Sequence, residues 1–196
     1  ALTAEVTYDG QKSLTIINKV DSAKVNIQAK KEFNDWNNSA SEFTFTLKAG
    51  NYCKLGETEP SDQVAVPMPV GAKDGVISGT ATSDPQKQNV DFGAITYKKA
   101  GTYHYTITER NDGKDGVSYD TTEHKVTVTV TKGTDRKNAL NADVKYDTKQ
   151  DSLTIKNTFT AATADIGLTK SFTNPETKEN WPVDTSFTFD LKADSN

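Results

Sequence analysis

The sequence has almost no cysteine, because Cys53 is the single one among 196 residues. An internal disulfide framework is therefore excluded, and a protein of this kind that works outside the cell needs another covalent source of stiffness. Cys53 is a conceivable half of a Cys–Gln thioester, but no recognisable glutamine motif accompanies it. An ordinary thiol is the better interpretation.

Long apolar runs and runs of like charge are also missing. No segment has the apolar length of a transmembrane helix, and the opening residues ALTAEVTYDG lack the basic and apolar regions of a signal peptide, so we expect no membrane insertion in this segment. The formal net charge of −4 is spread along the chain, which argues against nucleic acid as a partner. His104 and His124 lack metal-ligand spacing, and NDGKDG lacks the terminal acid of a calcium loop. We therefore predict no metal and no cofactor.

Strand-forming residues dominate what is present. Many segments are rich in Val, Ile, Thr, Tyr and Phe, alternate apolar with polar residues and are separated by turn residues, as in NDGKDG. No long stretch has helical apolar spacing, so any helix should be short. This pattern predicts an all-β fold of immunoglobulin-like antiparallel β-sandwich domains in tandem. The predicted strands include residues 4–8, 13–17, 23–30, 42–47, 101–108, 124–131, 142–146 and 151–157.

A repeat organises the chain. ALTAEVTYDGQKSLTIINKV at its start returns as ALNADVKYDTKQDSLTIKNTF, so that Asn18 maps onto Asn157, 139 residues later. The same shift maps AKKEF onto LTKSF and therefore Lys31 onto Lys170. A period this long indicates whole domains in tandem, because solenoid repeats are much shorter.

The phase of the repeat predicts the domain boundaries. Residues 1–19 correspond to the closing strands of a preceding repeat, and residues 20–160 form one complete β-sandwich domain. Residues 161–196 correspond to the opening strands of a following repeat. The pattern is thus that of a segment from a longer series of tandem domains.

Three polar residues continue apolar stripes of the complete domain. In GTYHYTITER every second residue from Tyr103 is aromatic or aliphatic until Glu109 takes the inward position. The same parity places Lys31 after the stripe of AKVNIQA and Asn157 after that of SLTI. Burying an acid or an amine is costly unless a partner offsets the lost hydration.

Chemistry between these residues would explain their burial. An apolar pocket favours the neutral forms of both charged groups, so the proton moves to Glu109 and the neutral amine of Lys31 attacks the side-chain carbonyl of Asn157. Glu109 would hydrogen-bond the carbonyl oxygen, shuttle protons and help ammonia leave. This is a single-turnover reaction rather than the work of an enzyme. The alternative interpretation is that all three residues face solvent at strand ends.

The residues also carry a family likeness. The spacing of AKKEF, AGTYHYTITE, GVSYDTTEHKVTVTVT and LTIKNTF resembles the isopeptide-linkage domains of Gram-positive major pilins and repeat-bearing surface adhesins, relatives of the CnaB-type inverse immunoglobulin fold. The resemblance implies a bond between Lys31 and Asn157 with Glu109 as the catalytic acid. It also makes Asn18 and Lys170 the equivalent positions of the flanking repeats, which should stay unreacted unless a neighbouring molecule supplies the missing strands.

Two functions follow as expectations. The first is a structural stalk or shaft module of a bacterial cell-surface pilus or repeat adhesin, extracellular, anchored to the cell wall through the parent protein and in contact with neighbouring repeats or pilus subunits. The alternative is an adhesin domain that recognises a host protein or glycan through the long Gly- and Pro-rich insertion at residues 54–75. Trp36 and Trp181 occupy matching places after each lysine motif, where an indole can shield the lysine from water.

Overall fold

The computed structural model describes residues 21–61, 64–134, 139–147, 150–171, 176 and 186–193. The strands predicted at residues 4–8 and 13–17 lie outside these ranges, as do Asn18 and Trp181. The chain divides into two units, residues 1–161 and residues 162–196. Within the described ranges, no helix is long and apolar enough to span a membrane.

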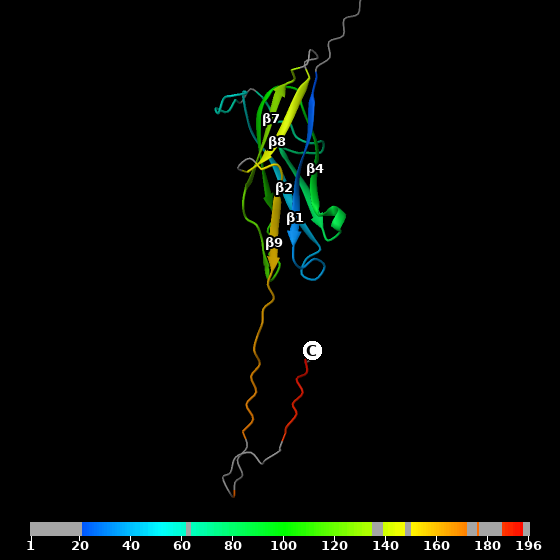
Figure 1. Ribbon diagram of the computed structural model, residues 1–196, viewed down its shortest axis with the longest axis vertical. Coiled ribbons are helices and arrows are strands. Elements are labelled where there is room, and N and C mark those ends of the chain that lie inside the picture. Colours follow the sequence, from blue (N-terminus) through cyan, green and yellow to red (C-terminus); the bar gives the residue numbers. More distant parts are fainter. Residues whose placement is uncertain are drawn as a thin grey trace, which may run out of the picture. The chain divides into compact units, whose positions relative to one another are not determined.

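The first unit is a two-layered β-sandwich (Figure 1). Its elements in chain order are β1 (Ala23–Phe33), β2 (Glu42–Cys53), β3 (Val76–Thr82), the 3-10 turn η1 (Pro85–Lys87), β4 (Asn89–Tyr97), β5 (Gly101–Glu109), β6 (Val117–Ser118), β7 (His124–Lys132), β8 (Leu140–Tyr146) and β9 (Thr154–Phe159). One sheet has the order β4-β1-β9-β6 and the other the order β3-β2-β5-β7-β8. The predicted all-β sandwich is confirmed, and helix in the described residues is confined to the short turn η1.

One strand pair departs from the antiparallel rule. β1 and β9 pair in parallel, with Lys31 opposite Ile155 and Phe33 opposite Asn157, and their arrowheads point to the same end of the sandwich (Figure 1). Parallel neighbours need a long connection, which the whole domain between these two strands supplies. The first and last strands therefore lie side by side and run in the same direction.

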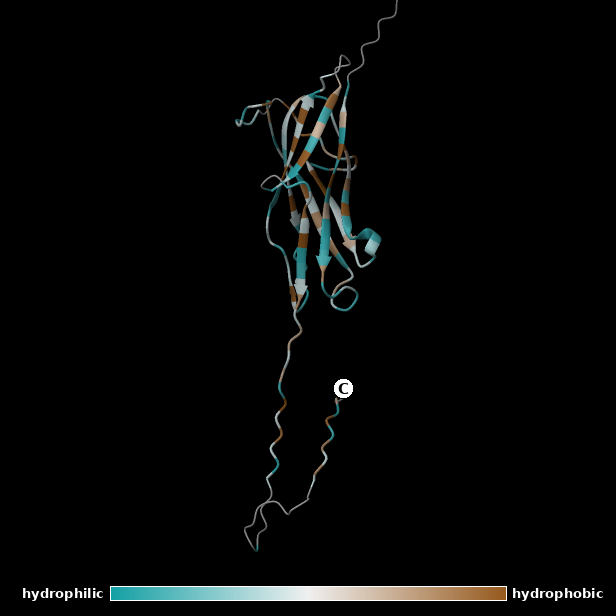
Figure 2. Cartoon of the chain, viewed as in Figure 1, coloured by the Kyte–Doolittle hydropathy of each residue, from teal (hydrophilic) through white to brown (hydrophobic). Residues whose placement is uncertain are grey.

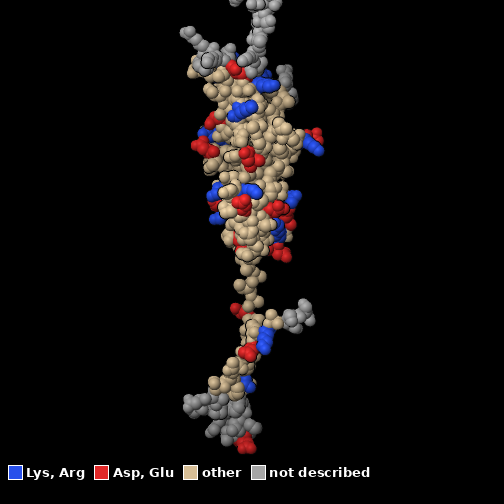
Figure 3. All heavy atoms as spheres, turned by 90° about the vertical axis from the view of Figure 1, so that its right-hand side faces the viewer, with Lys and Arg blue, Asp and Glu red and all other residues tan. Residues whose placement is uncertain are grey.

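Alternation along the strands builds the core between the two sheets. In β5 every residue at the odd positions from Gly101 to Ile107 is buried, while the residues between them are half-buried, and bands of opposite hydropathy alternate along the strands (Figure 2). Charged residues of both signs are interspersed over the face of the sandwich seen in Figure 3. The core includes Ile27, Phe43, Phe45, Leu47, Ile95, Ile107, Val126, Val128 and Ile155.

Three strands were not among the predicted ones, namely β3, β4 and β6. β3 and β4 each contain a glycine, which weakens a strand pattern. Gly79 has a packing reason, because a Cβ at this position would lie 2.5 Å from Cγ1 of Val90 in the opposite sheet. β6 has only two residues, and they pair with the end of β9 far along the chain. No local sequence pattern therefore predicts this strand.

Candidate functional site

Three residues from two sheets meet at one end of the core. Lys31 extends from β1 and Asn157 from β9, whereas Glu109 is the last residue of β5 in the facing sheet. The side chains of Lys31 and Glu109 are 0% exposed, and so is Asn157. The structure thus brings together the three residues that strand parity had placed inward.

One carboxylate oxygen bridges the amine and the amide. Oε1 of Glu109 lies 2.8 Å from Nζ of Lys31 and accepts a hydrogen bond of 2.8 Å from Nδ2 of Asn157. Although Nζ and Oε1 stand at ion-pair distance, their contact lacks hydrogen-bond geometry, and the described residues offer Nζ no hydrogen-bond partner. A buried ammonium in this position would lack most of the hydration that it has in water.

The surroundings favour the neutral amine. Burial lowers the pKa of Lys31, and its contact with Glu109 offsets that effect only in part. Nζ also lies 4.6 Å from the ring centroid of Phe43 and 5.6 Å from that of Phe45. Aromatic faces attract a cation, but the lost hydration is the larger effect. A neutral amine is the nucleophilic form of lysine.

A backbone group that the sequence analysis missed completes the arrangement. The N–H of Asp120 donates a hydrogen bond of 3.1 Å to Oδ1 of Asn157 and one of 3.3 Å to Oε2 of Glu109. A donor at the amide oxygen stabilises the negative charge that develops there when a nucleophile attacks the carbonyl carbon. Side-chain patterns do not report backbone donors, and the only local signal is the Asp-x-Thr turn, in which Asp120 accepts from the N–H of Thr122.

Aromatic side chains cover this end of the core. Trp36 packs edge-on against Phe33 and Phe43, with ring centroids 5.6 and 5.3 Å apart. Tyr119 also packs edge-on against Phe43, with ring centroids 5.9 Å apart. Trp36 is half-buried and Phe43 is fully buried. Phe43, which these rings contact, lies against the amine of Lys31, whose side chain is completely buried.

The flanking positions differ from this arrangement. Lys170 is exposed, and its Nζ lies 5.0 Å from the ring centroid of Phe187. Asn18 lies outside the described residues. Cys53 is buried, where its Sγ donates to the carbonyl oxygen of Thr58 at 3.4 Å and accepts from Asn51 at 3.3 Å. In the described ranges, no cluster of His, Cys, Asp or Glu side chains could hold a metal ion.

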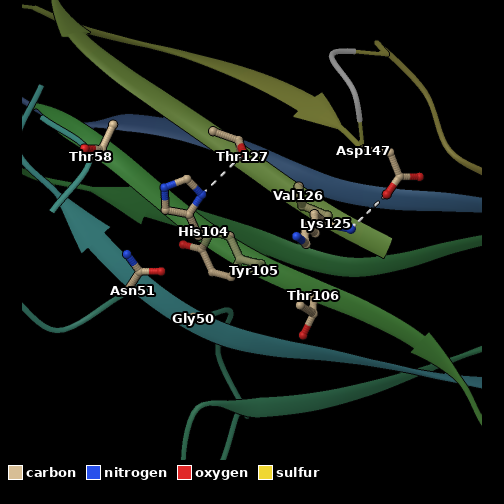
Figure 4. A pocket seen from close by; sticks show the side chains of 10 residues that line it. All are labelled: Gly50, Asn51, Thr58, His104, Tyr105, Thr106, Lys125, Val126, Thr127 and Asp147. Carbon is tan, nitrogen blue, oxygen red and sulfur yellow. Dashed lines mark hydrogen bonds between the residues drawn. The ribbon is translucent and has the colours of Figure 1, made fainter. Parts of the chain in front are cut away.

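A hollow of about 500 Å³ lies on the outer face of the five-stranded sheet, away from Lys31. Figure 4 shows its lining, with His104 on β5 pointing toward Thr127 on β7 and Asp147 beside Lys125. Of the described residues of the insertion at residues 54–75, Thr58 alone lines this hollow. Ligand binding by that insertion remains a prediction.

The insertion itself is partly packed against the sandwich. Its Pro67 carbonyl accepts a hydrogen bond of 2.8 Å from the hydroxyl of Tyr105, and Val64, Val66 and Met68 pack against the core. This part of the segment is therefore packed against the sandwich.

Comparison with known proteins assigns the family. Residues 27–160 match the family model FctA, the Spy0128-like isopeptide containing domain, and this span includes Lys31, Glu109 and Asn157. The chain belongs to this family, which confirms the resemblance to pilin isopeptide domains. No curated protein matches the chain.

Solved structures of pilins are also similar to the chain. The major pilin protein (T-13) from Streptococcus pyogenes serotype GAS131465 is 22% identical over 69% of this chain and 51% of that chain, with a TM-score of 0.40. The major pilin from Streptococcus pyogenes is 22% identical over 71% of this chain and 51% of that chain, with a TM-score of 0.38. The chain spans about half the length of these pilins.

Proposed function

We propose that the first unit forms an amide bond between Lys31 and Asn157 and that the bonded domain is a structural module of a pilus shaft or repeat adhesin on a bacterial surface. The observation that carries the proposal is the contact of one fully buried carboxylate oxygen, Oε1 of Glu109, with both Nζ of Lys31 and Nδ2 of Asn157. Membership of the isopeptide-domain family supports the same bond.

The reaction balances without any co-reactant. The neutral amine of Lys31 attacks Cγ of Asn157, the Nζ–Cγ bond forms, and the Cγ–Nδ2 bond breaks. Two protons accompany the departing nitrogen in the amide and a third comes from the lysine amine through Glu109, so that ammonia leaves and Glu109 ends as it began. The products are one amide and one ammonia, and the domain is its own substrate.

Three features support the proposed chemistry over hydrolysis or inertness. Oε1 of Glu109 already lies 2.8 Å from both the amine and the leaving nitrogen, so a proton has only a short distance to travel between them. The N–H of Asp120 lies on the oxygen of Asn157 that becomes negative. All three reacting side chains are buried, and this burial limits access of water to the same carbon.

The strand arrangement supports a mechanical role. Tension along an array enters the domain before Ala23 and leaves after Phe159. Because β1 and β9 lie side by side and run in the same direction, an amide between Lys31 and Asn157 would transmit that tension from one strand to the other. The residues between Lys31 and Asn157 would then carry no load. We infer that the partners are neighbouring repeats or pilus subunits and that the parent protein anchors the module at the cell surface.

The test is the intact mass of the purified chain under denaturing conditions. We expect the wild-type chain to be lighter than its calculated mass by one ammonia, and the Glu109→Ala chain to have its full calculated mass. Glu123→Ala removes an exposed carboxylate instead and should keep the mass loss. Fragmentation of the wild-type chain should place the link between peptides that contain Lys31 and Asn157. A wild-type chain at full mass contradicts the proposal.

A further inference from the structure

A charged link lies directly behind the amide-forming residues. Nε2 of His124 is 3.0 Å from Oδ2 of Asp120, and Nδ1 of the same ring is 2.9 Å from Oδ2 of Asp147. The side chain of His124 is 11% exposed and that of Asp120 is 20% exposed. The link therefore joins the turn before β7, the first residue of β7 and the end of β8.

The geometry fits the protonated ring. A neutral imidazole has one N–H donor, whereas an imidazolium has two, and ionised carboxylates can only accept. Both ring nitrogens of His124 face carboxylate oxygens, so only the imidazolium satisfies both contacts. Burial alone would lower the pKa of His124, but its contacts with Asp147 and Asp120 outweigh burial and raise it.

Other titratable groups surround this end of the core. Glu109 on β5 and Tyr146 on β8 belong to the strands that flank β7, and Lys31 on β1 comes from the opposite sheet. The neighbours of His124 in the sequence, Glu123 and Lys125, are exposed. The pKa of His124 is set by its burial and by the two carboxylates that contact the ring.

The link reaches the reacting atoms through one peptide group. The carboxylate of Asp120 binds His124, while the backbone N–H of the same residue donates to Oδ1 of Asn157. Asp147 is itself held, because its Oδ1 accepts from the N–H of Lys125 at 2.9 Å, the contact drawn in Figure 4. Loss of the proton from His124 would leave one nitrogen lone pair facing a carboxylate and would weaken the link between Asp120 and Asp147.

We propose that His124 is a positioning residue for amide formation: in its protonated form it fixes the Asp120 N–H on the oxygen of Asn157, so the domain bonds fastest below the pH at which His124 loses its proton. The inference rests on the proposed function, because it concerns the rate of the same reaction. It predicts that a pilus or adhesin module of this kind completes its crosslink more slowly in alkaline surroundings.

The experiment starts the reaction by folding. The chain is kept unfolded in urea after recovery from inclusion bodies, diluted into buffers from about pH 5.5 to about pH 8.5, which bracket the titration of histidine, and quenched in acid at intervals for intact-mass measurement. Fluorescence of Trp36 and Trp181 follows folding in parallel, so that the rate of ammonia loss is separated from the rate of folding. We expect the wild-type rate of ammonia loss to fall about tenfold across this range, which is less than the roughly 10²–10³-fold cost of removing such a donor, because the Asp120 N–H is loosened rather than lost.

The variants assign that change to one side chain. The chain has two histidines, so His104→Gln, on the outer face of the sheet, is the matched control and should keep the wild-type pH profile. His124→Gln should react about tenfold more slowly than wild type at low pH and lose the pH dependence. Asp147→Asn preserves the shape at a position whose φ of 40° an asparagine tolerates, and it should move the midpoint of the profile to lower pH.

The outcomes separate the two proposals. If the wild-type chain never loses ammonia, the proposed function fails. If it loses ammonia and His124→Gln keeps the wild-type rate and profile, the positioning role of His124 is wrong. Should His124→Gln not fold, the Asp147→Asn profile decides: an unshifted midpoint overturns the inference.

Discussion

Lys31 and Lys170 lie in similar sequence motifs 139 residues apart, and each amine lies near a phenylalanine ring. Nζ of Lys31 lies 4.6 Å from the ring centroid of Phe43, and Nζ of Lys170 lies 5.0 Å from that of Phe187. Phe43 and Phe187 open matching FTF motifs. Yet Lys31 is completely buried, whereas Lys170 is exposed.

The difference separates local from long-range causes. A lysine and a phenylalanine that are close in the sequence meet in both regions, so this contact needs no complete domain. The burial, carboxylate and amide at Lys31 come from strands much later in the chain, namely β5 with Glu109 and β9 with Asn157. A lysine motif alone therefore gives an aromatic contact, and the rest of the sandwich converts the lysine into a candidate nucleophile.

The largest expected effect tests this contrast directly. Lys31→Met replaces the amine by an apolar side chain of similar length, so the chain should keep its full calculated mass. Lys170→Met should still lose one ammonia, because Lys170 is exposed and lies outside the buried cluster. Intact-mass measurement of both variants checks the prediction, and a Lys31→Met chain that still loses ammonia would place the link elsewhere.

The next effect is on stability. An amide between Lys31 and Asn157 closes a loop of 126 residues, which on the chain-entropy model developed for disulfides stabilises the fold by about 5 kcal/mol. Lys31→Met should therefore lower Tm by roughly 10–20 °C. Scanning calorimetry gives the comparison, with Lys170→Met as the control that should unfold at the wild-type temperature. Equal Tm values for Lys31→Met and wild type would contradict a covalent link.

How much of this was predictable follows from the kind of signal each residue gives. Parity along a strand placed Glu109 and Lys31 on inward faces, because a period of two is visible in a single sequence. The contact of Oε1 of Glu109 with both Lys31 and Asn157 depends on how strands of two sheets are arranged. In a single sequence, this contact is predictable only through the family resemblance. The donor at Asp120 belongs to the backbone and has no residue-type signature.

The strands, too, were predictable where the sequence carries a local pattern. β5 and β7 alternate strictly and were predicted, whereas β3 and β4 contain glycines that sit where the sheets approach each other or the chain bends. Gly93 in β4 has φ 93°, a conformation that interrupts regular alternation. In the insertion at residues 54–75 the glycines and prolines are visible in the sequence, whereas the hydrogen bond between the Tyr105 hydroxyl and the Pro67 carbonyl depends on the folded chain.

A smaller effect is expected from the phenylalanines under the two lysines. Phe43 is fully buried among Phe33, Trp36 and Tyr119, so Phe43→Ala should destabilise the first unit by about 3–5 kcal/mol. Phe187 is 44% exposed, and Phe187→Ala should change stability by no more than about 0.5 kcal/mol. Denaturant unfolding in the Lys31→Met background measures both without the crosslink. Equal effects would mean that the two regions are packed alike.

The smallest effect is the dependence of stability on histidine titration, which belongs to the first unit alone because residues 162–196 contain no histidine. The contacts of His124 with Asp147 and Asp120 outweigh its burial and raise its pKa. Its contribution to stability is therefore fully present below the ordinary histidine value of about 6.5 and is lost as the pH rises through the folded-state value. Burial lowers the pKa of His104, so its contribution has the opposite sign: present at higher pH and lost as the pH falls.

In the Lys31→Met background, His124→Gln should cost more stability at about pH 6 than at about pH 8.5, and His104→Gln should not. Urea midpoints at the two pH values measure this, and a reversed order for His124→Gln would show that its ring is neutral in the folded chain.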